Sequence, residues 1–243
     1  MAAEIERVYR SVKHVGLRVR LMTKTDNADL PPEINLDRLF YKASLFDSVE
    51  ELRDAGFKIV RASEKRVTVF GHASAPGYLF KKLLRDVKRP FGEHLESYQK
   101  RVQGARALKA HLEALNINSI IVPRKWLCKL PRRFRRRGKP DHIVVVEKCN
   151  LLESEKIKRR YNALPKETVK DLCTIFFTFE RVDFAPRNWP FSTEGKIAAI
   201  DTGNMKLITK DRRESYKENV EKFPTDKCRR YGRALWDEFK RAR

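Results

Sequence analysis

The chain has 243 residues, 35% of them charged, and a formal net charge of +22 at pH 7. A positive field of this size attracts anionic partners such as nucleotides, phosphoproteins, nucleic acids or acidic membrane surfaces, and it does not choose among them. The cysteines form no Cys-x-x-Cys pair, no apolar run is long enough to cross a membrane, and the N-terminus lacks a signal-peptide core. We therefore expect no zinc site, no membrane span and a cytoplasmic protein, with a secreted effector as the alternative.

The first quarter of the chain predicts short helices and one strand. Apolar residues at helical spacing predict a helix over Ile5–Val15, and alternation predicts a strand over Leu17–Leu21. A short amphipathic segment follows at Leu36–Ala43. Ser48 and Glu51 have the spacing of a capping box, and Gly56 stands where a helix-ending glycine belongs, so residues 48–55 should form a helix.

The next segment predicts a strand meander followed by a long helix. The strands are expected at Phe57–Ala62, Arg66–Gly71 and Tyr78–Leu83, and the helix at Glu93–Leu115. The apolar face of that helix comprises Leu95, Tyr98, Val102, Ala105, Leu108 and Leu112. A short strand is expected at Ile120–Val122.

A basic run, Arg124–Lys139, holds nine Lys or Arg residues in sixteen and no acid. The ordinary interpretation of such a run is a solvated loop. The functional interpretation is an anion-binding patch that engages nucleic acid or an acidic protein, with Trp126 and Phe134 available to stack or insert. We favour a loop that also binds an acidic partner.

The second half of the chain predicts one buried strand and several helices. Ile143–Val146 is an apolar β-branched run typical of a central strand. Pro165 begins a helix that ends near Phe179 and whose core face comprises Val169, Leu172, Cys173, Phe176 and Phe179. Further elements are expected at Leu151–Tyr161 (helix), Lys196–Ile200 and Lys206–Thr209 (strands), Arg212–Lys222 and Asp226 to the end (helices).

Three polar residues surround a hairpin that is expected to turn at Gly195. Asn188 follows Asp183 by five residues, and the strand after the turn leads into Asp201. A carboxylate can accept a proton, and oxygen ligands such as those of Asn188 and Asp201 are the ones that Mg²⁺ prefers. Asp and Asn are also common turn residues, so a purely structural role is the alternative.

The pattern Asp183-x-x-x-x-Asn188, followed by Asp201-Thr202-Gly203, resembles the catalytic loop and metal-binding strand of the protein-kinase-like superfamily. The resemblance is closer to atypical and aminoglycoside-phosphotransferase-like kinases, or to pseudokinases, than to ordinary protein kinases. Arg181-Val182 replaces the family's His-Arg, and Thr202 replaces its Phe. Ser63-Glu64-Lys65 contains no glycine-rich loop, although His72–Gly77 could serve as a lid, and no Ala-Pro-Glu motif is present.

The resemblance implies an α+β, two-lobed protein-kinase-like fold with a minimal C-terminal lobe. It predicts an N-terminal extension at residues 1–56, a small lobe at 57–147 and a compact large lobe at 148–243. Backbone groups of the hinge, from Glu147 to Cys149, would then bind the adenine edge of ATP.

The same resemblance assigns roles to side chains. Asp183 would orient or deprotonate an acceptor hydroxyl, while Asn188 and Asp201 would hold Mg²⁺. Lys81 would neutralise the phosphates and be positioned by Glu96. The neighbouring Lys82 and Glu93 are the alternatives for this pair, and an exposed lysine on an edge strand is the structural alternative.

The sequence thus predicts an ATP-Mg²⁺-dependent phosphotransferase whose nucleotide partner is implied and whose phosphoacceptor is not readable. The alternatives are a catalytically inactive kinase-like module, a basic protein that binds nucleic acid or an acidic partner, and a nucleotidyl transferase.

Overall fold

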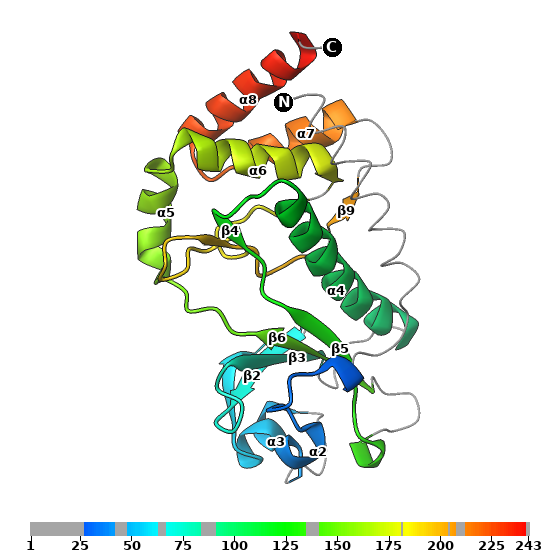
Figure 1. The fold of residues 1–243 in the computed structure, drawn as a ribbon. Helices are drawn as coiled ribbons and strands as arrows, with labels where there is room; N and C mark the ends of the chain where they lie inside the picture. The colour runs from blue at the N-terminus through cyan, green and yellow to red at the C-terminus, as the bar shows by residue number, and fades with distance from the viewer. Residues whose placement is uncertain are drawn as a thin grey trace. The chain divides into compact units, whose positions relative to one another are not determined.

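The computed structural model describes residues 27–41, 48–62, 67–83, 91–134, 141–180, 182–203, 205–207 and 212–241. The elements expected at Ile5–Val15 and Leu17–Leu21 lie outside these residues. The described chain is a mixture of helices and strands, as predicted, and divides into two compact units (Figure 1). We call the described residues of 23–102 and 124–148 the sheet unit, and those of 103–123 and 149–241 the helical unit.

This division differs from the three predicted segments, 1–56, 57–147 and 148–243. The described residues before position 57 fall with the sheet, and residues 103–123 fall with the C-terminal part of the chain. The boundary lies within one long helix, α4 (Phe91–Ala114), after Val102.

The sheet unit is built on an antiparallel sheet with the strand order β1-β2-β3-β6-β5. The strands are β1 (Phe57–Arg61), β2 (Val67–His72), β3 (Tyr78–Leu83), β6 (His142–Glu147) and β5 (Lys125–Lys129). The predicted meander and the predicted central strand are therefore confirmed. A β-bulge interrupts β1 between Ile59 and Arg61.

Both faces of this sheet are covered (Figure 1). On one face, the rings of Phe40, Phe57, Phe70 and Phe80 form a buried aromatic cluster beneath α2 (Leu36–Leu39) and α3 (Val49–Asp54). On the other face, Val144 and Val146 pack against Tyr98 and Val102 of α4. Because β6 is buried on both faces, its residues form a continuous apolar run rather than an alternating one.

The helix predicted over 48–55 is confirmed as α3. The Ser48 hydroxyl accepts the Glu51 N–H at 3.1 Å, and the Glu51 carboxylate accepts the Ser48 N–H at 3.3 Å, which completes the capping box. Gly56 ends the helix at φ +86°.

The predicted loop at Arg124–Lys139 was wrong in its first part, because Lys125–Lys129 is a strand of the sheet. The apolar triplet within it is buried on both faces, and this burial outweighs the two flanking lysines, whose stems can lie along the sheet. Trp126 is only 7% exposed and packs edge-on against Tyr78, so it is not available to stack on a ligand. The run continues into the 3-10 turn η2 (Arg132–Phe134), and residues 135–140 lie outside the described chain.

The helical unit contains the second half of α4 and the remaining elements of the chain. Its helices are α5 (Ser154–Asn162), α6 (Lys166–Thr178), α7 (Arg212–Glu221) and α8 (Asp226–Arg241). Its strand pairs are β4 (Ile120–Ile121) with β8 (Ile197–Ala198), which is parallel, and β7 (Phe179–Glu180) with β9 (Lys206–Leu207), which is antiparallel. The helices predicted after residue 150 are thus confirmed, with bounds shifted by a few residues at most positions.

An aromatic cluster forms the core of this unit. All five residues predicted for the core face of α6 are buried. Phe184 contacts the rings of Tyr161, Phe176, Trp189 and Phe223, with centroids 4.9 to 5.8 Å apart. No helix within the described ranges is both long enough and apolar enough to cross a membrane.

Candidate functional site

Asp183 is an exposed residue between two fully buried ones, Val182 and Phe184. The backbone before it is held by Asn219 of α7, whose Oδ1 accepts the Val182 N–H at 3.1 Å and whose Nδ2 donates to the Phe179 carbonyl at 2.9 Å. Asn219 is itself fully buried. Its amide therefore fixes the point at which the chain leaves β7 and presents the Asp183 carboxylate.

The segment from Asp183 to Trp189 closes on itself through the Asp183 carbonyl. This oxygen accepts a hydrogen bond from Trp189 Nε1 at 3.1 Å and a longer one from Asn188 Nδ2 at 3.4 Å. Because a carbonyl requires a donor, these contacts orient the Asn188 amide and leave its Oδ1 as an acceptor. No described residue donates a hydrogen bond to that oxygen.

The hairpin then brings the chain that leads to Asp201 back to Asn188. The strand in this part of the chain, β8, is shorter than the predicted Lys196–Ile200. Ser192 N–H donates to the Lys196 carbonyl at 2.7 Å, and the turn contains Gly195 at φ +83°, as the sequence predicted. The Ile200 N–H donates to the Asn188 carbonyl at 2.9 Å. This bond places Asn188 beside the residue that precedes Asp201.

Asp201 is half-buried, and its Oδ1 accepts the Gly203 N–H at 3.2 Å, which closes a short side-chain-to-backbone turn. The backbone of this turn meets α4 directly at Gly104. A Cβ atom added to Gly104 would lie 2.1 Å from the Thr202 carbonyl oxygen. Gly104 was not predicted as a site residue, although a single glycine within a helical pattern is a signal for such a close approach.

These groups fit a magnesium ion better than a transition metal. Asn188 and Asp201 offer an amide and a carboxylate oxygen, which are hard ligands. Among the described residues, no group of three or more His, Cys, Asp or Glu side chains could hold a metal by itself. Mg²⁺ is commonly held by one or two carboxylates together with substrate phosphates and water, so a two-residue set suits an ion that arrives with a nucleotide.

The predicted pair Lys81 and Glu96 belongs to the sheet unit. Lys81 lies opposite Val144, on the face of the sheet that α4 covers, and is half-buried, whereas Lys82 is only 3% exposed on the other face. Glu96, with its side chain 60% exposed, forms an ion pair with Lys100 at 2.6 Å. The Lys81–Glu96 pairing therefore stays a prediction, and the side chain of Glu93 lies outside the described structure.

The predicted hinge has two of its backbone donors already engaged. The Glu147 N–H donates to the Arg124 carbonyl at 2.9 Å, and the Lys148 N–H donates to the Gly77 carbonyl at 2.8 Å. The Glu147 carboxylate pairs with the Arg124 guanidinium, with Nη2 and Oε1 3.1 Å apart. The Glu147 N–H is therefore not available to an adenine ring, and Cys149 is half-buried. Adenine binding by the segment from Glu147 to Cys149 stays a prediction.

Tyr78, which lies opposite Glu147 at the start of β3, is a tyrosine that stays protonated. The Tyr78 hydroxyl donates to Glu33 Oε1 at 2.5 Å. Burial and the neighbouring Glu33 carboxylate raise the pKa of Tyr78 to about 12. This hydroxyl is therefore a hydrogen-bond donor and not a base at neutral pH.

No family model matches the sequence, and no curated protein matches it.

Proposed function

We propose that the protein is an ATP-Mg²⁺-dependent phosphotransferase of atypical kinase-like fold. The observation that carries the proposal is the hairpin bond from Ile200 N–H to the Asn188 carbonyl, which places Asn188 beside the residue that precedes Asp201. The Asp183 carbonyl ties the start of the same segment to Asn188 and Trp189. The backbones of Asp183, Asn188 and Ile200 are thus linked by hydrogen bonds within one hairpin.

Each of these residues has a distinct role in the proposal. The exposed Asp183 carboxylate orients an acceptor hydroxyl and receives its proton, while Asn188 Oδ1 and the Asp201 carboxylate hold Mg²⁺. Bound Mg²⁺ would supply neutralisation of phosphate charge. Lys81 belongs to the sheet unit, and its role at the phosphates stays a prediction. Phosphoryl transfer demands mainly positioning and electrostatic stabilisation, so such a small set of side chains can suffice.

A catalytically inactive kinase-like module is the second candidate. The engaged N–H groups of Glu147 and Lys148 favour it, because they leave fewer donors for a nucleotide base. The absence of glycine between the first two strands favours it too, since the usual backbone cover of the phosphates is missing.

The test combines thermal unfolding with an assay for release or transfer of the γ-phosphate. Millimolar ATP with Mg²⁺ should raise the unfolding midpoint of the wild type, because ligand at about 100 times its Kd stabilises by about 2.7 kcal/mol. Asp201→Asn should lose this shift. Asp29→Asn, which makes the same change at an exposed position of the sheet unit, should keep it.

Asp183→Asn separates binding from catalysis. It should keep the ATP-Mg²⁺ shift and lose about 10²- to 10⁴-fold in phosphate transfer, the usual contribution of a general base. An Asp183→Asn variant as active as the wild type would refute the catalytic role. A shift in the wild type without any turnover would establish the inactive module, and no shift at all would remove nucleotide binding from this hairpin.

A further inference from the structure

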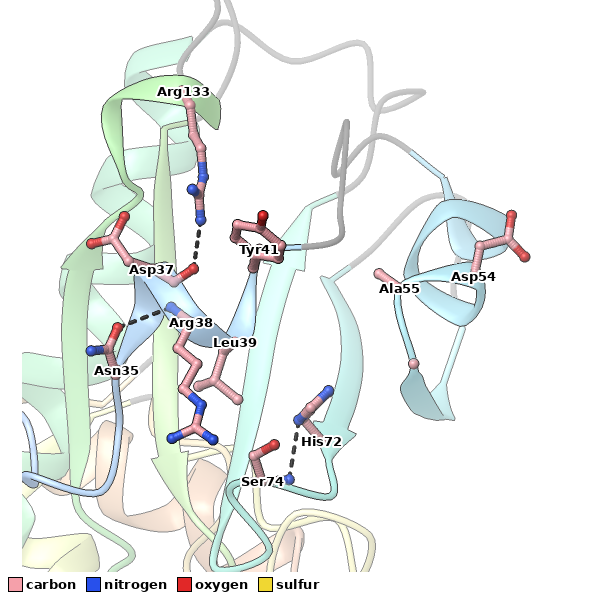
Figure 2. A pocket seen from close by; sticks show the side chains of 11 residues that line it. Asn35, Asp37, Arg38, Leu39, Tyr41, Asp54, Ala55, His72, Ser74 and Arg133 are labelled. Carbon is pink, nitrogen blue, oxygen red and sulfur yellow. Dashed lines mark hydrogen bonds between the residues drawn. The ribbon is translucent and has the colours of Figure 1, made fainter.

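A pocket of about 710 Å³ lies in the sheet unit between α2, the end of α3 and the turn after β2 (Figure 2). This volume is within the usual range of ligand pockets, about 300 to 1,000 Å³. None of the residues assigned above to phosphate transfer lines it. The pocket is therefore separate from the residues of the proposed phosphotransferase site. Its lining residues are Asn35, Asp37, Arg38, Leu39, Tyr41, Asp54, Ala55, Gly56, His72, Ser74 and Arg133.

Arg38 contributes a positively charged guanidinium group to this pocket. Its backbone N–H is capped by Asn35 Oδ1 at 2.9 Å, which fixes the turn from which the side chain projects. Its guanidinium forms no hydrogen bond or ion pair with any residue that the structure describes. A guanidinium carries five N–H donors, so Arg38 retains the capacity to bind an oxyanion such as phosphate.

Tyr41 and Arg133 form the opposite end of the pocket (Figure 2). The Tyr41 residue is 75% exposed, which is unusual for a large aromatic side chain. Arg133 lies over its ring, with Cζ 5.7 Å from the ring centroid, and donates from Nη2 to the Asp37 carbonyl at 2.5 Å. The arginine is thus held against the ring by the backbone of α2, and the exposed ring can stack with a planar group.

The remaining polar groups present donors rather than negative charge. The Ser74 N–H donates to His72 Nδ1 at 3.1 Å, so the neutral imidazole carries its proton on Nε2 as a donor. The His72 ring is fixed by Phe57, with centroids 4.8 Å apart. Asp37 and Asp54 also line the pocket, but Figure 2 shows both carboxylates turned outward.

We propose that this pocket binds single-stranded nucleic acid, with one base stacked on Tyr41 beside Arg133 and a neighbouring phosphate bound by Arg38. An exposed aromatic ring beside arginines is the combination that single strands use, because their bases are unpaired and their backbone is anionic. An acidic peptide would satisfy the arginines but would leave the ring without a planar partner. The net charge of +22 attracts a polyanion to the molecule as a whole.

The test is fluorescence anisotropy with a fluorescein-labelled oligouridylate of about 12 nucleotides, a length that covers one such site. Tyr41→Leu should weaken binding about ten-fold, whereas Tyr41→Phe should bind like the wild type, because stacking needs the ring and not the hydroxyl. Arg38→Gln should weaken binding and lower the slope of log Kd against log salt by about 0.7, the value for one phosphate contact on a single strand.

Arg61→Gln is the matched control, since it removes the same charge from an exposed residue at the far end of β1. It should change the affinity less than about two-fold. Equal losses for Arg38→Gln and Arg61→Gln would overturn the proposal in favour of diffuse electrostatic binding, and so would an unchanged Tyr41→Leu variant. Displacement of the probe by polyglutamate as effectively as by unlabelled oligouridylate would show instead a surface for acidic protein. Tyr41→Leu should keep the ATP-Mg²⁺ shift of the wild type. Loss of oligonucleotide binding can therefore be distinguished from loss of nucleotide binding at the phosphotransferase site.

Discussion

At the scale of single residues, buried hydrogen-bond donors hold the Asp183 segment in place. Trp189 donates from Nε1 to the Asp183 carbonyl, and its own carbonyl accepts the Tyr161 hydroxyl at 2.5 Å. Burial raises the pKa of Tyr161 well above its ordinary range, so the hydroxyl remains a donor at any working pH. A buried polar group that keeps its partner is a rigid support, because losing the partner would cost about 1 to 3 kcal/mol.

His111 presents the opposite case, since both of its ring nitrogens are buried without a hydrogen-bond partner among the described residues. Its ring packs edge-on against Phe179, with centroids 5.6 Å apart. Burial lowers the pKa of His111 from 6.5 to about 4. Between these two values the unfolded chain binds a proton that the folded chain refuses, so the free energy of unfolding falls as the pH falls through this range.

We expect His111→Leu to remove that dependence. At 1.36 kcal/mol per pKa unit, the wild type should lose about 3 kcal/mol relative to the variant between pH 6.5 and pH 4. Urea unfolding of both proteins across this range measures the difference, and the same comparison at pH 8, where the imidazole is neutral in both states, isolates the change in packing. Parallel stability curves for the two proteins would show that His111 does not titrate in this way.

At the scale of secondary-structure elements, α4 supports the candidate site through its backbone. Gly104 is buried in this helix, and the Thr202 carbonyl occupies the space where a side chain would begin. In an ordinary helix interior, alanine is more stable than glycine by roughly 0.5 to 1 kcal/mol. Here a Cβ atom 2.1 Å from a backbone oxygen forces either the helix or the Asp201 turn to move.

Gly104→Ala should therefore destabilise the protein, by about 1 to 3 kcal/mol as for other overpacked sites, and should abolish the ATP-Mg²⁺ shift. Gly71→Ala is the control, because a Cβ atom there makes only ordinary contacts, the nearest 3.6 Å away at Leu79, and it should leave both stability and the shift almost unchanged. Thermal unfolding with and without ATP-Mg²⁺ measures both effects. A Gly104→Ala variant more stable than the wild type would mean that the contact is looser than the structure shows.

Elements that depend on residues close together in the chain could be predicted from the sequence. The capping box of α3, the glycine turn of the hairpin and the apolar face of α6 depend on residues close together in the chain, and the structure contains all three. β5 could not be predicted, because burial of Trp126 between neighbouring elements overrides the basic composition around it. Asn219 was missed for the same reason, since its partners Phe179 and Val182 lie about 40 residues away in the chain.

At the scale of the whole molecule, a net charge of +22 on 243 residues means that repulsion between like charges lowers the stability of the folded chain. Visible ion pairs such as Arg233 with Glu221 and Arg124 with Glu147 are exposed, and exposed pairs contribute little, about 0 to 1 kcal/mol each. The repulsion among the excess cations should therefore dominate the response to salt.

We expect the unfolding midpoint to rise as NaCl increases from low concentration to about 0.3 M, because the screening length falls below about 10 Å once the salt exceeds 0.1 M. Differential scanning calorimetry at fixed pH measures the midpoint. The rise should be larger than that of a variant in which exposed lysines distant from both candidate sites are changed to glutamine. A midpoint that falls with salt would instead show that attractive pairs outweigh the repulsion.

The bulge in β1 hinders strand pairing between copies of this protein. Among the described residues, β1 and β5 are the two outer strands of the sheet, and an outer strand with unpaired backbone groups can recruit a strand from another molecule. The bulge breaks the regular spacing of β1 beside Val60, which is 57% exposed, while β5 begins and ends with a lysine. Lys125 is buried and Lys129 is paired with Asp141, so the protection lies at the β1 border, where the interrupted pairing makes a poor template for fibril growth.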